Sequence, residues 1–358
     1  MPAIATSIEP VTLGDRVSAV PLVGILIVNW RGLRDTRECG ESLRRLTYPR
    51  ARVYVADNAS GDGSVEALRA EFPTFRVIEN NTNLGFSGAT NQLMTQAIAE
   101  GCDYVLLLNN DTIVDRDFLQ PIVEAAQADG RIGLVSCKIY AANPPEIVWF
   151  AGGRIDRESF FLFAHIGEGH PDNESFAQPR ETQWATGCCL LARPSMIAQI
   201  GTLDERFGYY YEDVDWCVRA RAAGWKIWYE PRGKIWHKIG RSTGRRNLVF
   251  EYYNHRNVLF VGRRVYRPIE GCLHFLRGIR QALNYSPYRY DKAAVYEGVL
   301  DGLLLRNRAL EEIGQAKWSN ALVAAERGAR KFCRKLLRRR EQAFGLRTSS
   351  TRSCTTNK

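Results

Sequence analysis

Residues 104–111 read Tyr-Val-Leu-Leu-Leu-Asn-Asn-Asp, a four-residue aliphatic run that ends on three polar side chains. A short apolar run of this kind is typical of a strand buried on both faces of a sheet. Open α/β sheets bind their ligands at the carboxyl ends of such strands. Asn and Asp are also ordinary turn residues, so the cluster alone leaves a turn and a binding site equally open. Asp111 is therefore a candidate site residue.

The N-terminal part of the chain alternates between strand-like apolar runs and helix-like segments. Such β–α–β alternation predicts a mostly parallel sheet that is covered by helices on both faces. Strands are expected at residues 23–29, 52–57, 75–78, 104–108 and 132–136, and helices at 33–46, 64–71, 87–99 and 118–128.

Polar residues follow each of the first four expected strands. The first strand stops at Asn29, the second at Asp57, the third runs into the Asn-rich segment 80–86, and the fourth stops at 109–111. The carboxyl ends of parallel strands share one edge of the sheet, so this recurrence favours a binding edge over four separate turns.

Two glycines precede the third expected helix, in the pattern Gly85-x-x-Gly88 that leads into Asn91. Glycines let backbone N–H groups approach a phosphate, and the start of a helix favours negative charge. The pattern is neither G-x-G-x-x-G nor a Walker loop, and no glycine cradle follows the first strand. The usual nicotinamide and ATP sites are therefore not expected.

The length of 358 residues favours one large domain with an appended unit, and the 45% hydrophobic content is that of an ordinary globular protein. Nine cysteines, an odd number with no C-x-x-C pair, do not form a disulfide framework and indicate a reduced, cytosolic compartment. We expect neither a signal peptide nor a membrane span, because the longest early apolar run, residues 20–28, is interrupted by Pro21.

The positive charge of the chain is concentrated at its end. Residues 330–358 contain ten Lys or Arg and a single acid, Glu341, and so carry +9 of the net charge of +10. Apolar residues fall near one face of this segment, which predicts a basic amphipathic helix on an anionic membrane surface, with a solvated charged tail as the alternative. The nearly neutral body offers no basic groove, so nucleic-acid binding is not expected.

After the fifth expected strand the regular alternation breaks. Residues 142–183 contain Pro144-Pro145 and Gly152-Gly153, and an apolar strand is expected to resume at 184–192. Long loops inside a compact domain are usually functional or mobile. We interpret this segment as a wall on the acceptor side of the site.

The densest cluster of charged and aromatic residues lies at 204–216, ahead of a helix that Gly224 is expected to end. Asp215 and Arg219 form an i, i+4 pair on this helix, and Glu212 and Asp213 fall in its first turn. Acids there compensate the helix dipole, but the start of a rigid helix also places a general base well. From the residues alone, these two explanations stand about even.

A set of short motifs then appears in a specific order over roughly residues 22–260. They are Val28-Asn29-Trp30, Val55-Ala56-Asp57-Asn58-Ala59-Ser60-x-Asp62-Gly63-Ser64, Asn83-Leu84-Gly85-Phe86-Ser87-Gly88-x-x-Asn91, Leu106-Leu107-Leu108-Asn109-x-Asp111, Thr186-Gly187-Cys188-x-Leu190-Leu191, Asp204-Glu205-x-Phe207, Glu212-Asp213-x-Asp215-x-Cys217-x-Arg219, Gly224-Trp225 and His237. This ordered set resembles the GT-A family 2 glycosyltransferases, especially the bacterial rhamnosyltransferase-like branch.

The resemblance implies an α/β fold of the GT-A type, Rossmann-like, with a mostly parallel central sheet flanked by helices and a C-terminal helical, basic extension. The glycosyltransferase domain would span 22–245, after an N-terminal extension at 1–21. A helical region would follow at 246–329, and the basic amphipathic tail at 330–358.

The activity that the resemblance implies is inverting transfer of a sugar, possibly rhamnose, from a dTDP- or UDP-sugar to a glycan or lipid-linked acceptor. This activity would belong to bacterial cell-surface polysaccharide assembly. The protein would be cytoplasmic and peripheral on the inner face of the plasma membrane. The alternatives are a sugar-nucleotide pyrophosphorylase and a non-catalytic sugar-nucleotide-binding paralogue. A pyrophosphorylase would need a Gly- and Arg-rich loop after the first strand, and residues 30–33 are too short for one.

Residue roles follow from the resemblance position by position. Asp213 would be the catalytic base, and Asp111 and His237 would bind a divalent metal, Mg²⁺ or Mn²⁺. His237 follows an apolar strand expected at 225–229. A lone His beside such a run is more often a packed residue, and only the resemblance favours a ligand. Donor-binding residues would be Asn29, Asp57, Asn83, Gly85, Asn91, Asn109, Asn110 and Arg256, and acceptor-side residues would be Trp184, Gly187 and Glu212.

Two of these assignments carry specific reservations. Arg256 could reach a phosphate, but a packed helix face is an equal alternative. Asn109 and Asn110 leave Asp111 as the only acid of the metal motif, where many family members have two or three. We therefore expect metal and donor to bind together.

Overall fold

The computed structural model describes residues 20–239, 248–284, 291–306, 313, 315–317 and 319–324. Residues 1–19 of the expected N-terminal extension and the whole basic tail, 330–358, lie outside this part of the chain. The expectation of an amphipathic tail helix therefore stays a prediction.

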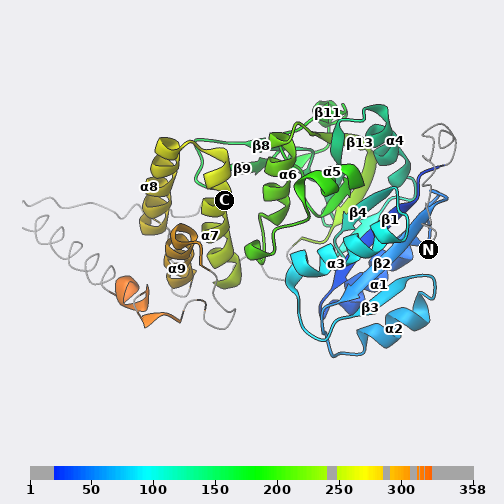
Figure 1. Ribbon diagram of the computed structural model, residues 1–358, viewed down its shortest axis with the longest axis horizontal. Helices are drawn as coiled ribbons and strands as arrows, with labels where there is room; N and C mark the ends of the chain where they lie inside the picture. Colours follow the sequence, from blue (N-terminus) through cyan, green and yellow to red (C-terminus); the bar gives the residue numbers. More distant parts are fainter. Residues whose placement is uncertain are drawn as a thin grey trace, which may run out of the picture.

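Four parallel strands form one half of the central sheet, in the order β3–β2–β1–β4 (Figure 1). Their buried aliphatic side chains belong to the main hydrophobic core, and the register places Asn29 opposite Asp57 at the carboxyl edge. The predicted parallel sheet is confirmed. The strands are β1 (Val23–Asn29), β2 (Ala51–Asp57), β3 (Arg76–Glu79) and β4 (Tyr104–Leu108).

Helices connect and cover these strands, with bounds that differ from the expected ones by a few residues. The third helix packs on β1 and β2, where a Cβ at Gly24 would lie 2.9 Å from the Cβ of Ala97. Glycine at this position thus lets the helix approach the sheet closely. The helices are α1 (Leu33–Leu43), α2 (Ser64–Glu71), α3 (Gly85–Ala99) and α4 (Leu119–Ala128).

The other half of the sheet mixes strand directions. β12 (Cys189–Ala192) runs antiparallel between β4 and β6 (Ile132–Ala141), so the strand expected at 132–136 is longer than predicted and does not pair with β4 directly. The strand expected at 184–192 begins only at Cys189. Both differences arise because residues distant in sequence pair across the sheet, which local patterning does not record.

The last strand, β13 (Lys226–His237), is also longer than expected, since the sequence indicated an apolar strand only at 225–229. Its parallel ladder with β6 shifts register between Glu230 and Lys234, where Pro231 has no N–H to donate. Beyond this irregularity β13 pairs with β5 (Thr112–Val114) and sets His237 opposite Thr112. After this irregularity, β13 therefore places His237 beside the segment that follows β4.

Residues 142–183 are not the irregular loop that the sequence suggested, because they form short strands. β8 and β9 make a separate hairpin, and Gly153 of this hairpin forms a bridge to Trp184. These strands are too short for an alternating pattern to show in the sequence. They are β7 (Ile147–Phe150), β8 (Gly153–Ile155), β9 (Phe163–His165), β10 (His170–Pro171) and β11 (Arg180–Glu181).

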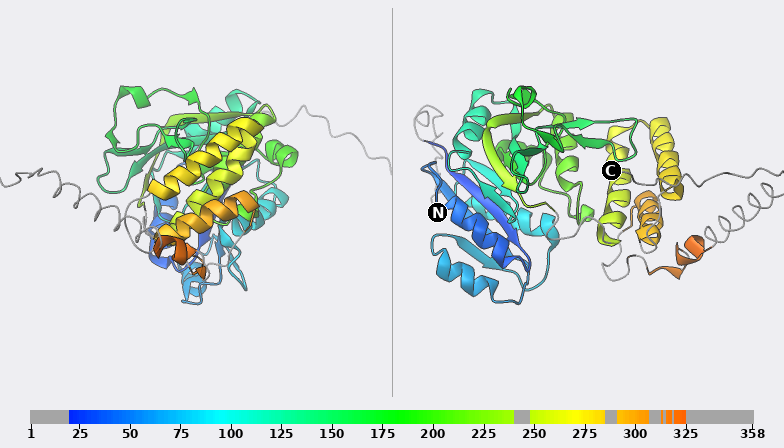
Figure 2. Two further views of the ribbon diagram at one scale, coloured as in Figure 1. Left: turned by 90° about the vertical axis from the view of Figure 1, so that its left-hand side faces the viewer. Right: turned by 180° about the vertical axis from the view of Figure 1, so that it is seen from behind.

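A helical region follows the sheet and lies on the side opposite α1 and α2 (Figures 1 and 2). α7 (Leu248–Val265) packs against α9 (Asp291–Leu304) and contacts α6 (Glu212–Ala222), while α8 (Pro268–Asn284) packs on both α7 and α9. A short helix, α5 (Pro194–Ile200), precedes α6. Within the described residues, no helix combines the length and the apolarity needed to cross a bilayer.

Candidate active site

Hydrogen bonds join the carboxyl ends of β1, β2 and β4. The buried Asp57 carboxylate accepts from Asn29 Nδ2 at 2.7 Å and from the hydroxyl and N–H of Ser60 at 2.7 and 2.9 Å. Asn29 Oδ1 accepts from the Thr36 hydroxyl at 2.7 Å, and that hydroxyl accepts from Asn110 Nδ2 at 3.0 Å. The structure thus brings together three residues that the sequence placed at one edge.

The segment after β3 is fastened to the same edge. Asn58 donates through Nδ2 to the Gly85 carbonyl at 2.9 Å and accepts from Asn80 at 3.0 Å. Asn83 Oδ1 accepts from the Gly85 N–H at 2.8 Å, and Gly85 has a φ of +70°, a conformation that suits glycine. The loop that leads into α3 therefore has a defined path beside β2.

Two residues that were expected to bind the donor, Asn91 and Arg256, instead bind backbone groups of the protein itself. Asn91 exchanges hydrogen bonds with the backbone of Leu203, both at 3.0 Å, and so joins α3 to the segment before α6. Arg256 is fully buried in α7 and donates to the carbonyls of Arg206 and Phe207 at 2.7 and 3.3 Å. Arg256 therefore does not lie at the carboxyl edge of β1, β2 and β4, where the donor was expected to bind. It belongs to a packed helix face, which was the alternative interpretation.

Asp111 and His237 meet at the junction of β4 and β13. His237 Nε2 lies 3.2 Å from Asp111 Oδ1, and the Lys238 N–H donates to the Asp111 carbonyl at 3.0 Å. Burial disfavours the charged form of Asp111, but the hydrogen bond and charge of His237 outweigh it, so the pKa of Asp111 is lowered. The carboxylate is thus ionised at neutral pH.

A carboxylate oxygen and an imidazole nitrogen aimed at each other fit a divalent cation such as Mn²⁺ or Mg²⁺. Across the described residues, no group of three or more His, Cys, Asp or Glu side chains gathers in a metal-binding arrangement. The pair would therefore leave most coordination positions to other oxygen ligands.

Asp213 lies in the first turn of α6 and is held by backbone N–H groups. Its Oδ2 accepts from Gly187 and its Oδ1 from Val214, both at 2.7 Å. A Cβ at position 187 would lie 3.4 Å from that of Asp213, an ordinary van der Waals distance, so the two residues pack directly against each other. Burial raises the pKa of Asp213, and the two N–H groups counteract that rise. The result is a fixed carboxylate that can accept a proton.

Glu212, like its neighbour Asp213, has a raised pKa. Burial, together with the charge of Asp213, raises the pKa of Glu212 to about 8. Its Oε2 is buried and has no hydrogen-bond partner among the described residues. Glu212 therefore carries a proton at neutral pH.

The segment just before β12 contacts both acidic groups. The Asn109 N–H donates to the Cys188 carbonyl at 3.0 Å. Burial raises the pKa of the Cys188 thiol, and the charges of Asp111 and Asp213 both add to the effect. Gly187, the residue before Cys188, donates its N–H to Asp213, and Asn109 lies two residues before Asp111, so the 187–188 segment links the Asp111–His237 pair and the fixed carboxylate in one site.

Sequence reasoning missed two residues of this site, Trp149 and His165. The Trp149 ring lies 4.6 Å, centroid to centroid, from both His165 and His237. His165 Nδ1 is 3.0 Å from the Trp149 carbonyl, and its ring is 5.2 Å from that of Trp184, an expected acceptor-side residue. Burial lowers the pKa of His165, against the charges of Glu168 and Asp213. A lone His in a segment without periodicity gave no signal.

The loop before Glu212 is held in place from α7. Asn257 Nδ2 lies 2.8, 2.7 and 2.8 Å from the carbonyl oxygens of Phe207, Tyr209 and Tyr210. Tyr210 and Tyr211 have φ values of +65° and +69°, which are unfavourable for a side chain as large as tyrosine. The buried amide of Asn257 compensates by satisfying the carbonyls of this strained turn.

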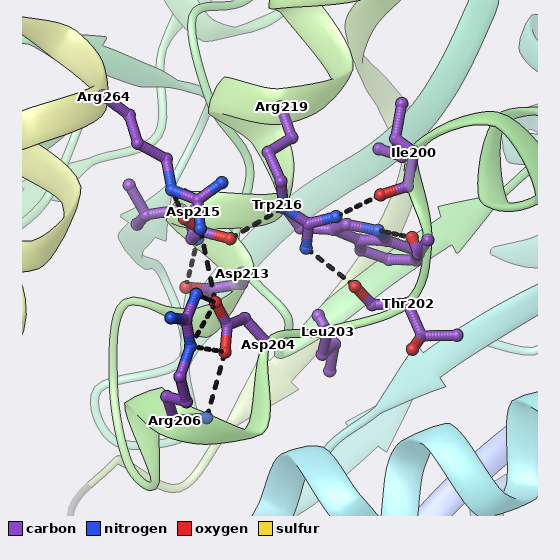
Figure 3. A network of polar contacts seen from close by, with 12 residues as sticks. Ile200, Thr202, Leu203, Asp204, Arg206, Asp213, Asp215, Trp216, Arg219 and Arg264 are labelled. Carbon is purple, nitrogen blue, oxygen red and sulfur yellow. Dashed lines mark hydrogen bonds and ion pairs between the residues drawn. The ribbon is translucent and has the colours of Figure 1, made fainter. Parts of the chain in front are cut away.

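A network of charges supports the other side of α6 (Figure 3). Asp215 accepts from Arg219 Nε at 2.8 Å, which confirms the expected i, i+4 pair, and Arg264 Nε of α7 lies 2.7 Å from its second oxygen. Arg264 also reaches Asp204 at 3.3 Å, and Asp204 pairs with Arg206 at 2.6 Å. Both the loop and the helix that carry Asp213 are thus fastened to α7.

Comparison with known proteins gives consistent matches. Residues 25–200 match the family model described as glycosyl transferase family 2. The chain is 29% identical over 231 residues to N-acetylglucosaminyl-diphospho-decaprenol L-rhamnosyltransferase of Mycobacterium tuberculosis, covering 57% of this chain and 72% of that one. It is 26% identical over 207 residues to the low-salt glycan biosynthesis hexosyltransferase Agl10 of Haloferax volcanii, covering 56% and 61%.

A solved structure of GalNAc-T7 with UDP, GalNAc and Mn²⁺ is similar with a TM-score of 0.56. The match covers 84% of this chain and 57% of that one at 13% sequence identity. At this identity the likeness concerns the fold.

Proposed function

Because this chain belongs to the family 2 glycosyltransferases, we propose that it transfers a sugar, with inversion at the anomeric carbon, from a nucleotide-diphosphate sugar to a lipid-linked glycan acceptor. Rhamnose from a dTDP donor is the first candidate, since the mycobacterial relative is named as a rhamnosyltransferase that acts on a diphospho-decaprenol substrate. A UDP-sugar is the second. The observation that carries the proposal is that neighbouring residues of one segment contact both acidic groups, since the Gly187 N–H binds Asp213 and the Cys188 carbonyl accepts from Asn109, two residues before Asp111.

The donor nucleotide would bind at the carboxyl edge of β1, β2 and β4. Asp57 is the candidate partner of the nucleobase, since three hydrogen bonds hold its carboxylate in one orientation. Asn83 and Gly85 would line the nucleotide pocket, and Asn109 and Asn110 the diphosphate end. Arg256 and Asn91 are left out of the donor contacts because their polar atoms bind the protein's own backbone.

Asp111 and His237 would hold a divalent cation, Mg²⁺ or Mn²⁺. When bound, such a cation neutralises charge that develops on the departing diphosphate. The lowered pKa of Asp111 suits this role, because the carboxylate does not have to lose a proton before it binds a cation at neutral pH.

Asp213 would act as the base. The acceptor hydroxyl forms a new bond to the anomeric carbon while the bond from that carbon to the diphosphate oxygen breaks on the opposite face. Asp213 takes the hydroxyl proton. Protonated Glu212 can donate a hydrogen bond to the acceptor without adding a second negative charge beside Asp213. Gly187, Trp184 and His165 would form the acceptor-side wall.

The test is a transfer assay with dTDP-rhamnose and a panel of UDP-sugars, in the presence of Mn²⁺ and a lipid-linked N-acetylglucosamine acceptor. We expect Asp213→Asn to lower turnover by a factor of about 100 or more while donor binding, read by thermal shift, stays unchanged. Asp117→Asn, at an exposed aspartate, is the control.

Three results would count against the proposal. Equal turnover by wild type and Asp213→Asn would overturn the role of Asp213 as the catalytic base. Absence of transfer by the wild type with every donor, with donor binding intact, would favour a non-catalytic paralogue. Formation of a nucleotide sugar from a nucleoside triphosphate and a sugar 1-phosphate would favour a pyrophosphorylase.

A further inference from the structure

Helix α8 presents an apolar stripe to solvent. Ile269, Leu273 and Leu276 are 79%, 53% and 57% exposed, and Cys272 and Ile279 are exposed on the same side. Spacings of three and four residues place all five on one face of the helix. Single exposed apolar residues are ordinary, but a continuous stripe marks an interaction surface.

The opposite face of α8 fixes the direction of this stripe. His274 is buried, with its ring 5.3 Å from that of Phe160 and 4.9 Å from that of Tyr266. A Cβ at Gly278 would lie 2.8 Å from the Phe160 ring, so the helix sits directly on this side chain. The stripe therefore points away from the body of the protein, along the outer helices seen in the left view of Figure 2.

Basic residues outnumber acidic ones around the stripe. Arg267, Arg277 and Arg280 are exposed on or next to α8. Glu270, an acid of the same helix, lies 3.5 Å from Arg157 and accepts from the Arg267 N–H at 3.1 Å. An exposed apolar stripe edged by arginines fits a bilayer of acidic lipids, which has anionic headgroups at its surface and apolar acyl chains beneath them. A second copy of α8 would bring like charges together.

The stripe is tied to the acceptor-side wall. Arg277 donates to the Arg157 carbonyl at 2.6 Å, and Phe160 lies under α8. In the same segment, Phe161 accepts at its carbonyl from the Tyr211 hydroxyl at 3.2 Å, and Phe163 contacts the Trp184 ring at 6.1 Å. One short segment thus packs against α8 on one side and against the site on the other.

We propose that α8 is a membrane-docking helix, whose stripe of Ile269, Leu273 and Leu276 enters the interfacial layer of an anionic bilayer while the flanking arginines meet lipid phosphates. This surface is separate from the basic tail at 330–358. It deepens the proposed function, since a lipid-linked acceptor would then lie in the same bilayer as the docking helix, next to the wall that α8 supports.

The experiment is sedimentation of the full chain with vesicles of phosphatidylcholine alone or mixed with phosphatidylglycerol. We expect binding to the anionic vesicles that weakens with added salt. Leu273→Asp combined with Leu276→Asp should weaken it by about tenfold or more, because both side chains leave the interface and add negative charge. Val20→Asp, an exposed apolar residue just before β1, is the matched control.

A probe on Cys272 gives a second measurement. Cys272 is the exposed cysteine of the described residues, so the full chain with Cys333→Ser and Cys354→Ser can carry an environment-sensitive fluorophore there. We expect a blue shift with anionic vesicles and none with neutral ones. The proposal is overturned if the double Asp variant binds vesicles like the wild type, since the tail would then suffice. It is also overturned if the stripe mediates only self-association, seen as a variant-sensitive mass without a vesicle-dependent shift.

Failure of this inference and failure of the proposed function are distinguishable. Sugar transfer to a water-soluble acceptor does not require docking, so the double Asp variant should transfer to it at the wild-type rate. Vesicle binding without any transfer activity would count against the proposed function and leave the docking helix in place.

Discussion

The side-chain amide of Asn257 lies 2.8 Å from the carbonyl oxygen of Tyr210, and two further carbonyls of the same turn lie within 2.8 Å of it. Tyr210 has a φ of +65° and stands two residues before Glu212. A residue of the helical region therefore determines the path by which the chain enters α6. Asn257 does not reach the site itself and acts as a positioning residue.

Replacement of Asn257 by Ala should lower kcat by about tenfold, because the carbonyls lose their donor and the turn before Asp213 relaxes. Buried unsatisfied carbonyls should also cost ~1–3 kcal/mol of stability. The measurement is kcat and donor Kd on folded protein, with Kd unchanged. Asn254→Ala is the control, since the Asn254 amide donates to the Phe250 carbonyl within α7 and, among the described residues, to no carbonyl of the turn. Equal losses of kcat in both variants would contradict the positioning role.

Glu212→Gln should stabilise the protein at high pH. Folded Glu212 keeps its proton until about pH 8, whereas the unfolded chain releases it near the ordinary value of 4.5. Between these values folding takes up a proton, so the wild type loses stability as pH rises. Relative to the wild type, the free energy of unfolding of the variant should be higher by ~2–4 kcal/mol at pH 8.5 and nearly unchanged at pH 4.5. Thermal unfolding at both pH values measures this, and a gain independent of pH would contradict the raised pKa.

Asp111→Asn should abolish the metal-dependent part of donor binding, because the Asn109-Asn110-Asp111 motif contains no other acid. Thermal shift with a nucleotide sugar, with and without Mn²⁺, measures the effect. His237→Ala should weaken the same shift by removing the second ligand. Asp115→Asn, in the loop after β5, serves as the control. A metal-dependent shift that survives in Asp111→Asn would show that the cation binds elsewhere.

Gly153→Ala tests the acceptor-side wall. An added Cβ would collide with the Trp184 indole, which donates to the Arg154 carbonyl at 3.2 Å. We expect a loss of ~1–3 kcal/mol from overpacking and a higher acceptor KM with donor binding unchanged. Gly130→Ala is matched, since a Cβ at position 130 meets nothing within 4 Å. A rise in donor Kd instead would place Trp184 on the wrong side of the site.

The parts of the fold that the sequence predicted are those whose burial is local. Residues 104–108 are buried on both faces and read as an apolar run, so β4 was found with its bounds. β12 was expected to begin at residue 184 and begins at Cys189, because its extent is set by pairing with β4 and β6, segments far apart from it in sequence. The extension of β13 was missed because Pro231 interrupts the pattern that continues to His237.

The same distinction holds for the candidate site. Asp111 and Asp213 stand directly at the end of a strand and the start of a helix, where sequence patterns are strongest. His165 joins the site through ring contacts with Trp149 and Trp184 and through its Nδ1, which lies 3.0 Å from the Trp149 carbonyl. Asn257 and Arg256 act through carbonyls some fifty residues earlier in the chain. Only the tertiary structure separates such roles from ordinary helix packing.

The fastening of the 206–210 turn to α7 bears on where this protein can be divided. A fragment ending near residue 245 would keep every strand of the sheet and every proposed ligand, yet it would lack the donors of Arg256, Asn257 and Arg264. Its turn would have three carbonyls open to water and two tyrosines in an unfavourable conformation. We therefore expect a fragment cut at the boundary drawn from the sequence to be less stable than a chain that extends through α7.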